Sequence, residues 1–206
     1  MPIFDSNNNK ERMPYEHYTA LVAEMDPVEI AERCGLDWDG QWLTVPLMTE
    51  TLRVSLPNFG FEGAEPPIST QILLLRYLTN GKLEPWTGKF LAYRDMPWGE
   101  VYFRQFQGRC LIRCAWMFNG KLAHAPYVRE KLQGETLGKC DAGMQFTFLP
   151  GLQMQLLLWE GDEEFPPSAQ ILFSDNFPMA FSAEDMAFVG DILLNRCKAL
   201  LKEAQG

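Results

Sequence analysis

Residues 144–173 read MQFTFLPGLQMQLLLWEGDEEFPPSAQILF. The apolar runs at 144–149 and 152–159 are separated by Pro150-Gly151, which is a direct signal for a hairpin turn. A third apolar run, at 169–173, follows an acidic and proline-rich segment and predicts a short strand. This stretch therefore indicates an antiparallel sheet as the basis of the fold.

Helical patterns flank this sheet on both sides. Asp26-Pro27 is a strong helix start, with Asp as N-cap and Pro at the first helical position, and Gly35 is expected to end that helix. Ser182 followed by Asp185 predicts a cap for the last helix. The other expected elements are a helix from Pro14, a hairpin at 42–45 and 51–56, a buried helix at 69–78, and helices at 101–118 and 121–132.

The length of 206 residues suits one domain. We expect a disordered lead at residues 1–13 and a single domain at 14–206. Its class is α+β, with helices packed on a mainly antiparallel sheet built from two or more hairpins. Residues 62–73 and 160–172 share Glu-Gly, Pro-Pro and Gln-Ile-Leu. Two interpretations of this similarity remain open, a shared turn chemistry at two hairpin exits and an old duplication.

Composition narrows the function classes. The formal net charge is −9, whereas a general nucleic-acid or anionic-membrane binder needs a basic surface. The longest strongly aliphatic run, residues 72–75, is too short to span a bilayer. The five cysteines are widely spaced and the first twelve residues are polar without an apolar signal region, so we expect free thiols in the cytoplasm.

The candidate site is the acidic segment after the second strand of the hairpin. Its expected binding residues are Trp159, Asp162, Glu163, Glu164, Phe165, Pro166, Pro167 and Ser168, together with His124. Neighbouring carboxylates suit a hard cation, but consecutive residues of an extended chain point to opposite faces. A solvated turn whose acids accept from nearby backbone donors is the commoner arrangement. The rigid Pro166-Pro167 pair also suits a recognition surface, because it fixes the backbone shape before binding.

Other chemical motifs are weaker. His124 is the best single candidate for a general base or a metal ligand, although a histidine in such a helix is more often structural. Cys110 and Cys114 share one face of a predicted helix, but the absence of a C-x-x-C element favours core cysteines over metal ligands. The Gly-Lys pairs lack the following Ser or Thr of a phosphate-binding loop, and no G-x-G-x-x-G occurs.

Aromatic residues are concentrated in the middle and late chain. The set comprises Trp86, Trp98, Tyr102, Phe103, Phe106, Trp116, Phe118, Trp159 and Phe165. Most are expected in the core. A minority is expected to suit an apolar pocket for a planar ligand, with Arg94, Arg104 or Arg109 supplying charge to an acidic substituent.

Three segments together carry a family resemblance. Residues 73–78 (LLLRYL), 88–99 (GKFLAYRDMPWG) and 158–173 (LWEGDEEFPPSAQILF) make the chain similar to the uncharacterised domain family DUF3786, and residues 181–185 (FSAED) fit as well. The resemblance covers about residues 15 to 201. It implies a setting in anaerobic bacteria or archaea, where some members are fused to an iron–sulfur domain of the kind found in corrinoid-protein subunits. Because this chain has no cysteine cluster for such a cofactor, the resemblance implies a separate iron–sulfur or corrinoid protein as partner.

Three functions follow as hypotheses. The leading one is a cytosolic binding or accessory module, linked to corrinoid or other tetrapyrrole and one-carbon metabolism, with a small-molecule ligand or partner at the acidic segment. The second is a metal-assisted enzyme that uses Asp162, Glu163 or Glu164 with His124. The third is a protein-interaction scaffold, which an exposed apolar patch beside the acidic segment would favour. No cofactor is specified by the sequence.

Overall fold

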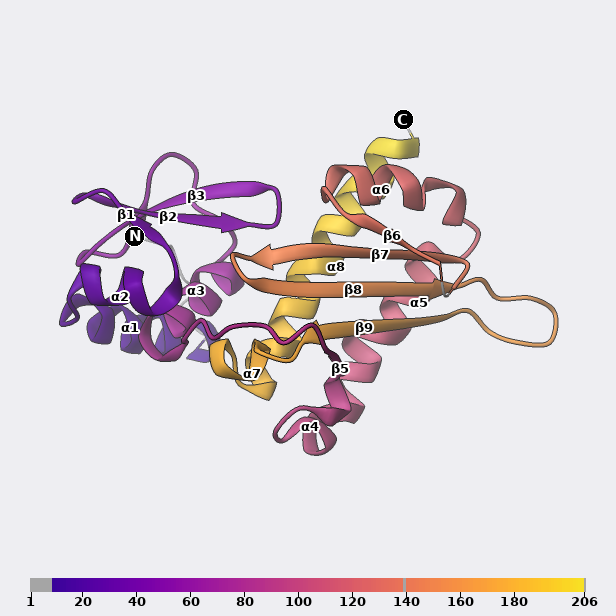
Figure 1. The fold of residues 1–206 in the computed structure, drawn as a ribbon, viewed down its shortest axis with the longest axis horizontal. Helices are drawn as coiled ribbons and strands as arrows, with labels where there is room; N and C mark the ends of the chain where they lie inside the picture. The colour runs from indigo at the N-terminus through magenta and orange to yellow at the C-terminus, as the bar shows by residue number, and fades with distance from the viewer. Residues whose placement is uncertain (1–8, 139, 206) are drawn as a thin grey trace.

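The computed structural model describes residues 9–138 and 140–205, and it contains two separate antiparallel sheets with helices around them (Figure 1). The first sheet has the strand order β1-β2-β3-β4 and the second the order β5-β9-β8-β7-β6. The predicted α+β class and the hairpins are confirmed. The hairpins differ from expectation in one respect, because they are divided between two sheets.

The N-terminal half contains three helices and the first sheet. Its elements are α1 (Asn9–Ala23), α2 (Pro27–Cys34), β1 (Asp37–Trp38), β2 (Trp42–Leu47), β3 (Glu50–Ser55), β4 (Gly60–Phe61) and α3 (Ile68–Asn80). The predicted caps of α2 are confirmed: the Asp26 carboxylate accepts from Val28 N at 2.8 Å, and Gly35 takes a left-handed φ of 63°.

Helix α1 begins earlier than the expected end of the disordered lead. Residues 9–13 are helical, and the Arg12 guanidinium donates to the Asn9 side chain at 2.8 Å. Lys, Glu and Arg at 10–12 are good helix formers, which explains the extension through Pro14. The remainder of the expected lead, residues 1–8, lies outside the described residues.

The C-terminal half forms around the second sheet. Its elements are β5 (Phe90–Ala92), η1 (Tyr93–Asp95), α4 (Gly99–Phe106), the π-helical η2 (Gln107–Ile112), α5 (Arg113–Phe118), η3 (Leu122–His124), α6 (Ala125–Lys131), β6 (Glu135–Leu137), β7 (Ala142–Leu149), β8 (Leu152–Trp159), β9 (Ser168–Ser174), α7 (Phe177–Ala180) and α8 (Ala183–Gln205). The expected helix at 101–118 is present as α4, η2 and α5 in succession. The expected helix at 121–132 is divided into η3 and α6, with Pro126 in the first turn of α6 where its missing N–H costs little.

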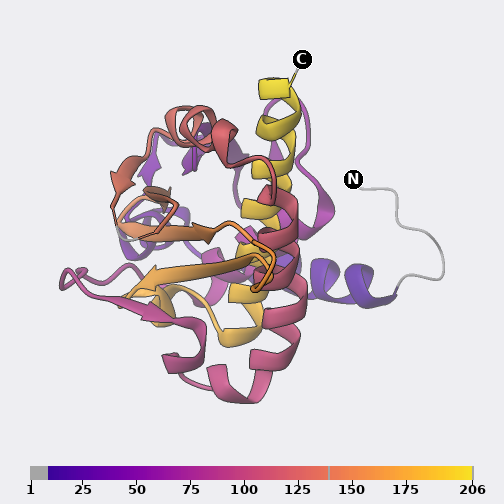
Figure 2. The ribbon, with the colours of Figure 1, turned by 90° about the vertical axis from the view of Figure 1, so that its right-hand side faces the viewer.

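The second sheet is buried on one face. Leu152, Met154, Leu156 and Leu158 of β8 are buried and alternate with partly exposed residues. Helices α5 and α8 lie on the buried side (Figure 2). On the other face the Gln155 amide donates to Gln145 at 2.9 Å across the β7–β8 pair. One packed and one polar face is the usual form of an antiparallel sheet.

Helix α8 connects the two halves of the molecule. Its predicted cap is confirmed, because Ser182 Oγ accepts from Asp185 N at 3.2 Å and the Asp185 carboxylate accepts from Ser182 N at 3.3 Å. Asp185 also pairs with Arg76 of α3 at 2.6 Å, where both side chains are mostly buried. Helices α3 and α8 therefore pack together across the boundary between the two sheets.

Candidate functional site

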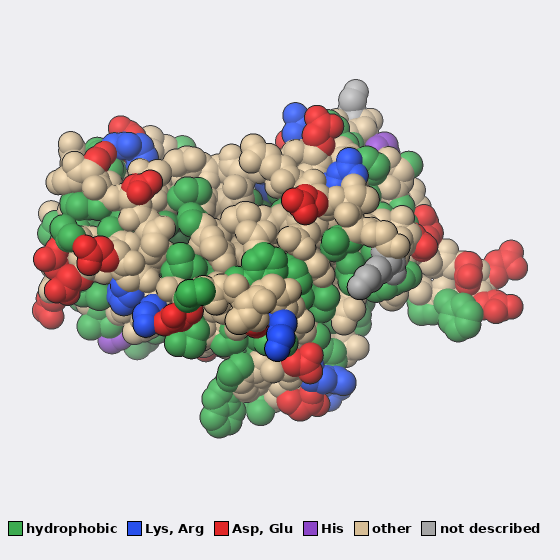
Figure 3. Space-filling model, in the orientation of Figure 1, with side chains coloured by type: hydrophobic (Ala, Val, Ile, Leu, Met, Phe, Trp, Pro, Cys, Tyr) green, Lys and Arg blue, Asp and Glu red, His purple; other side chains and the backbone are tan. Residues whose placement is uncertain are grey.

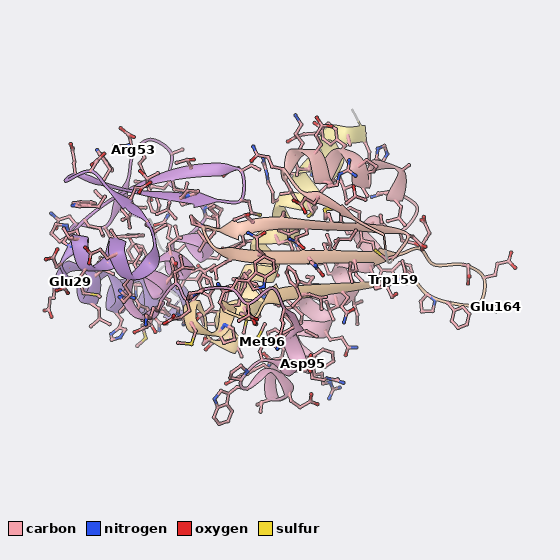
Figure 4. The ribbon with its side chains drawn as sticks, in the orientation of Figure 1. Glu29, Arg53, Asp95, Met96, Trp159 and Glu164 are labelled. Atoms are coloured by element: carbon pink, nitrogen blue, oxygen red, sulfur yellow. The ribbon has the colours of Figure 1, made fainter. Side chains whose placement is uncertain are left out.

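The acidic segment forms a protruding loop between β8 and β9. This loop, residues 160–167, extends beyond the end of the second sheet, with acidic side chains and an apolar group at its tip (Figures 1 and 3). Glu164 lies near the far tip and Trp159 at the sheet end (Figure 4). The Asp162, Glu163, Glu164, Phe165 and Pro166 side chains are all exposed, Phe165 by 67%. The loop presents its side chains to solvent.

Asp162 shapes the tip of the loop. Its carboxylate accepts from Phe165 N at 2.7 Å and from Glu164 N at 2.8 Å, and Asp162 N donates to Phe165 O at 2.9 Å. The backbone N–H groups of Phe165 and Glu164 lower the pKa of Asp162 below its ordinary value. Of the two arrangements expected for these acids, Asp162 takes the one in which a carboxylate caps its own turn.

The base of the loop is tied to the turn that follows α5. Glu160 N donates to Asp141 Oδ2 at 2.9 Å, and Gly161 N donates to Asn119 Oδ1 at 3.3 Å. Gly120 N in turn donates to the Glu160 carboxylate. These bonds connect the loop to β7 and to the end of α5, so the loop leaves the sheet from a fixed base.

Trp159 lies between two concave surfaces. The first, which we call the outer hollow, has a volume of about 530 Å³ and is lined by Asp141, Trp159, Glu160, Asp162, Phe165, Pro166 and Ser168. The second, which we call the inner pocket, has a volume of about 340 Å³ and is lined by Ala92, Tyr93, Arg94, Asp95, Phe103, Phe106, Leu111, Trp159, Ala169, Gln170 and Ile171. Trp159 is thus the one predicted site residue that borders both.

The inner pocket brings together residues that the sequence had only grouped by type. Phe103, Phe106 and Trp159 form aromatic walls, and Arg94 supplies the cation. The Arg94 guanidinium lies 3.8 Å from the centre of the Phe103 ring and pairs with Glu100 at 3.0 Å. Arg94 is thus the arginine that lines this pocket, whereas Arg104 and Arg109 do not line it, and the planar ligand stays a prediction.

Tyr93 supports the wall of the inner pocket through its contacts with Phe106 and α8. Its ring stacks on Phe106 with centroids 4.0 Å apart, and its hydroxyl donates to Ala183 O at 2.6 Å. Burial raises the pKa of Tyr93 to about 12, so the phenol stays protonated. Tyr93 serves as a structural support of the pocket, and its residue type was the only signal for this role that the sequence contains.

The inner pocket borders an open sheet edge. Strand β5 pairs only with residues 172–174 of β9, and the chain then turns away into η1. Asp175 N donates to Lys89 O, so odd-numbered residues of β9 direct their N–H and C=O groups toward the β5 side. By the same alternation, Ala169 directs its backbone groups to that side, where β5 has already ended.

His124 lies apart from this site. It is half-buried at the start of α6, and it lines neither the outer hollow nor the inner pocket. Within residues 9–138 and 140–205, no group of three or more His, Cys, Asp or Glu side chains is arranged to hold a metal ion. The use of His124 with the loop acids stays a prediction without an arrangement that supports it.

The cysteines of the helices are core residues. Cys110 and Cys114 are buried, and Cys110 Sγ contacts Ala187 O of α8 at 3.6 Å. Burial raises the pKa of Cys110 to about 12 and that of Cys114 well above its ordinary value. Both thiols therefore stay protonated, as expected for packing residues rather than metal ligands.

Several apolar side chains on the outer side of the α4–α5 helix are exposed, contrary to the expectation that most aromatics are core. Trp98 is 75% exposed, Val101 69%, Trp116 60% and Ile112 51%. Ile112, the last residue of η2, and Trp116 of α5 are four residues apart on this continuous helix. Asn119, directly after α5, contacts the loop base. Their spacing on a helix was the sequence signal for this face, but it does not distinguish a buried from an exposed stripe.

Comparison with known proteins identifies one relationship. The model of a family described as a domain of unknown function (DUF3786) matches residues 26–196. No curated protein and no solved structure matches the chain. Among the described residues, no helix has the length and apolar character needed to cross a membrane.

Proposed function

Since the chain belongs to the DUF3786 family, whose function is unknown, we propose its function from its geometry: it is a non-catalytic accessory module that binds an extended, basic segment of a partner protein. The segment would lie along the free edge of β9 and beside the loop at 160–167. The observation that carries this proposal is an exposed acidic loop, fixed at its base, next to an unpaired strand edge and an aromatic pocket.

The strand edge supports the proposal through backbone chemistry. An extended peptide that adds to a sheet gains main-chain hydrogen bonds, while its alternate side chains fill neighbouring pockets. Ala169 directs its backbone groups to the open side, and the inner pocket begins at the same residues. A side chain of the added strand would enter the inner pocket between Phe103 and Trp159.

The charge of the loop supports a basic partner. Within the part of the chain that the structure describes, the Glu163 and Glu164 carboxylates make no hydrogen bond or ion pair, whereas Asp162 caps its own turn. Lys or Arg side chains of a partner would complement these two charges. Trp159 and Phe165 line the same hollow and offer aromatic faces to a cation.

The partner and the setting remain proposals from the family resemblance. A separate iron–sulfur or corrinoid protein in an anaerobe is the partner that the resemblance suggests, and one-carbon metabolism is the context. We place the protein in the cytoplasm, which is supported by its five free cysteines.

Crosslinking from the loop, followed by affinity measurement, tests this function. A photoreactive phenylalanine analogue at Phe165 should capture the partner in cells, and the captured protein should present a basic extended segment. The double variant Glu163→Gln/Glu164→Gln should weaken the affinity of the purified pair by roughly 2- to 30-fold at low salt, as expected for two exposed ion pairs. The matched control Glu29→Gln/Glu32→Gln, on exposed positions of α2, should leave the affinity unchanged.

The variant Ala169→Pro tests the contribution of strand pairing at the edge of β9 separately from that of the loop charges. Proline removes an N–H that points away from β8, so the sheet should keep its melting temperature. Partner affinity should nevertheless fall at least tenfold. An unchanged affinity in both Ala169→Pro and the double glutamine variant would refute the proposed binding mode.

A small-molecule function is the second candidate, and the inner pocket favours it. Its aromatic walls and Arg94 suit part of a planar acidic molecule such as a tetrapyrrole, although about 340 Å³ is near the lower end of ligand sites. A corrinoid that raises the melting temperature of wild type but not of Phe103→Ala would support this ligand. The metal-assisted enzyme stays a prediction, and a divalent cation that raises the melting temperature of wild type but not of Asp162→Asn would support it.

A further inference from the structure

A cavity lies at the boundary between the two halves of the molecule, far along the sequence from the loop. Its volume is about 260 Å³. The lining comes from the end of the β2–β3 hairpin, from the start of α3 and from the middle of α8: Leu47, Met48, Glu50, Leu52, Pro66, Pro67, Ser69, Thr70, Ile192, Asn195, Arg196 and Ala199. The molecular surface is hollowed between the β2–β3 hairpin and the second sheet, with basic atoms visible at the floor (Figure 3). We call it the junction cavity.

Arg196 is the charged group of the junction cavity. Its Nε is buried and has no hydrogen-bond acceptor in the described chain. Its other nitrogens make only long contacts, to Glu50 Oε1 at 3.4 Å and to Thr49 Oγ1 at 3.4 Å. The Glu50 side chain is 61% exposed, so it can turn into solvent without loss of packing. The Arg196 side chain is 27% exposed, and its buried Nε–H is an unused donor that is suited to bind an anionic oxygen.

The remaining walls are mainly apolar. Leu47, Leu52 and Ile192 contribute hydrocarbon surface, and Met48 adds an adaptable side chain. Helix α3 begins at this wall, and Pro67 at its N-cap position offers no side-chain acceptor to the first-turn N–H groups. The partial positive charge of this helix end has the same sign as Arg196. An anion with an apolar body is the ligand that such a lining complements.

We propose that the junction cavity binds a small monocarboxylate with a short apolar body, such as a medium-chain fatty acid or an aromatic acid. The carboxylate accepts from Arg196 and displaces Glu50, and the apolar body lies against Leu47, Leu52 and Ile192. A single negative charge is specified because Arg196 is the one cationic side chain among the described residues that line the cavity. This proposal is independent of partner binding at the loop.

Titration of the whole chain with matched ligands tests the proposal. Octanoate and benzoate serve as anionic probes, 1-octanol as the neutral isostere and inorganic phosphate as the anion without an apolar body. Calorimetry gives the affinities, and the Nε–H signal of Arg196 in a ¹⁵N spectrum reports the site. Octanoate should bind at least tenfold more tightly than octanol and should shift this signal.

Three variants test whether the measured affinity for octanoate arises from binding in the junction cavity. Arg196→Gln should weaken octanoate binding by roughly 10- to 100-fold, since a hydrogen bond to a charged group is lost, and should leave octanol binding unchanged. Lys198→Gln removes a charge from an exposed position of the same helix and should change neither. Ala199→Phe fills the cavity and should abolish binding of octanoate and octanol while the melting temperature is kept.

Three results would overturn the proposal. The first is equal affinity for octanoate and octanol in the wild type, because Arg196 would then contribute nothing. The second is a shift of the Arg196 signal by phosphate as large as that by octanoate, which would show that the apolar walls are not used. The third is no displacement of this signal at millimolar octanoate.

Discussion

At the scale of single residues, short polar side chains form hydrogen bonds with the backbone groups that are left unpaired where helices and strands begin or end. Asp26 and Ser182 do so next to helices, and both were predictable because donor and acceptor lie within three residues. Asn176 was not predictable. Its amide donates to Glu84 O at 2.8 Å and to Gly151 O at 2.9 Å, and these partners are 92 and 25 residues away.

We predict that Asn176→Ala destabilises the protein by about 2–4 kcal/mol, since two carbonyls and the Ser174 hydroxyl lose their partner in the interior. Urea unfolding monitored by tryptophan fluorescence measures this change. Asn80→Ala, at an exposed helix end, is the control and should stay within about 0.5 kcal/mol of wild type. A cost for Asn176→Ala as small as that of the control would contradict the role of this network.

The hydrogen bonds of Asp162 predict how the turn at the tip of the loop responds to acid pH. Its pKa is lowered by the N–H groups of Phe165 and Glu164, so the turn should be fully formed above the unfolded value of about 3.9. The turn should be lost only as pH falls through the lower folded-state pKa. Amide chemical shifts of Glu164 and Phe165 against pH measure this transition. Asp162→Asn should keep the turn without the transition, and Asp162→Ala should lose the turn at every pH.

At the scale of elements, periodicity predicted most helices and strands, because each depends on neighbours in sequence. An identical local sequence was not sufficient to predict the secondary structure. The tripeptide Gln71-Ile72-Leu73 is helical in α3, whereas Gln170-Ile171-Leu172 is a strand in β9. The second segment pairs with β8 through its preceding hairpin. Sheet pairing overrides local preference here, and the possible duplication stays a prediction.

Two glycines in packed helices should respond oppositely to alanine. A Cβ on Gly108 of η2 would meet no heavy atom within 4 Å, so Gly108→Ala should stabilise the protein by about 0.5–1 kcal/mol. A Cβ on Gly190 of α8 would lie 2.6 Å from Cys110 Sγ, so Gly190→Ala should destabilise it by about 1–3 kcal/mol. Thermal unfolding of both variants measures the pair. A stabilising effect of Gly190→Ala would show that α8 and η2 are not closely packed at this point.

At the scale of the whole molecule, long-range packing created the sites that sequence reasoning missed. The charged loop was predictable because its acids and prolines are adjacent. The inner pocket depends on Tyr93 and Arg94 lying beside Ile171, and the junction cavity on Met48 lying near Arg196. No pattern within a window of ten or twenty residues contains such neighbours, so both cavities required the structure.

Buried thiols in the shared core make stability depend on alkaline pH. Burial raises the pKa of Cys110 and of Cys197 to about 12, above the unfolded value of about 8.5. The unfolded chain therefore releases protons that the folded chain retains, so stability is fully present below about pH 8.5 and falls above it. We expect each thiol to remove about 1.4 kcal/mol per pH unit in this range.

Urea unfolding between pH 7.5 and 10.5 measures this slope. Cys110→Ala should reduce the slope by about 1.4 kcal/mol per pH unit, whatever its effect on stability at neutral pH. Val128→Ala, at a buried position without a titratable group, is the control and should keep the wild-type slope. Equal slopes in all three proteins would show that Cys110 ionises freely in the folded state.

Helix α8 follows all the other described elements along the chain, yet α3, α4 and α6 all pack on it. During synthesis, the faces of α3, α4 and α6 that pack on α8 would stay uncovered until residues 183–205 leave the ribosome. A nascent chain that stalls before Ser182 should therefore expose its leucine- and phenylalanine-rich faces to chaperones and proteases, and a nonsense mutation there should yield rapid degradation rather than a shortened, working protein.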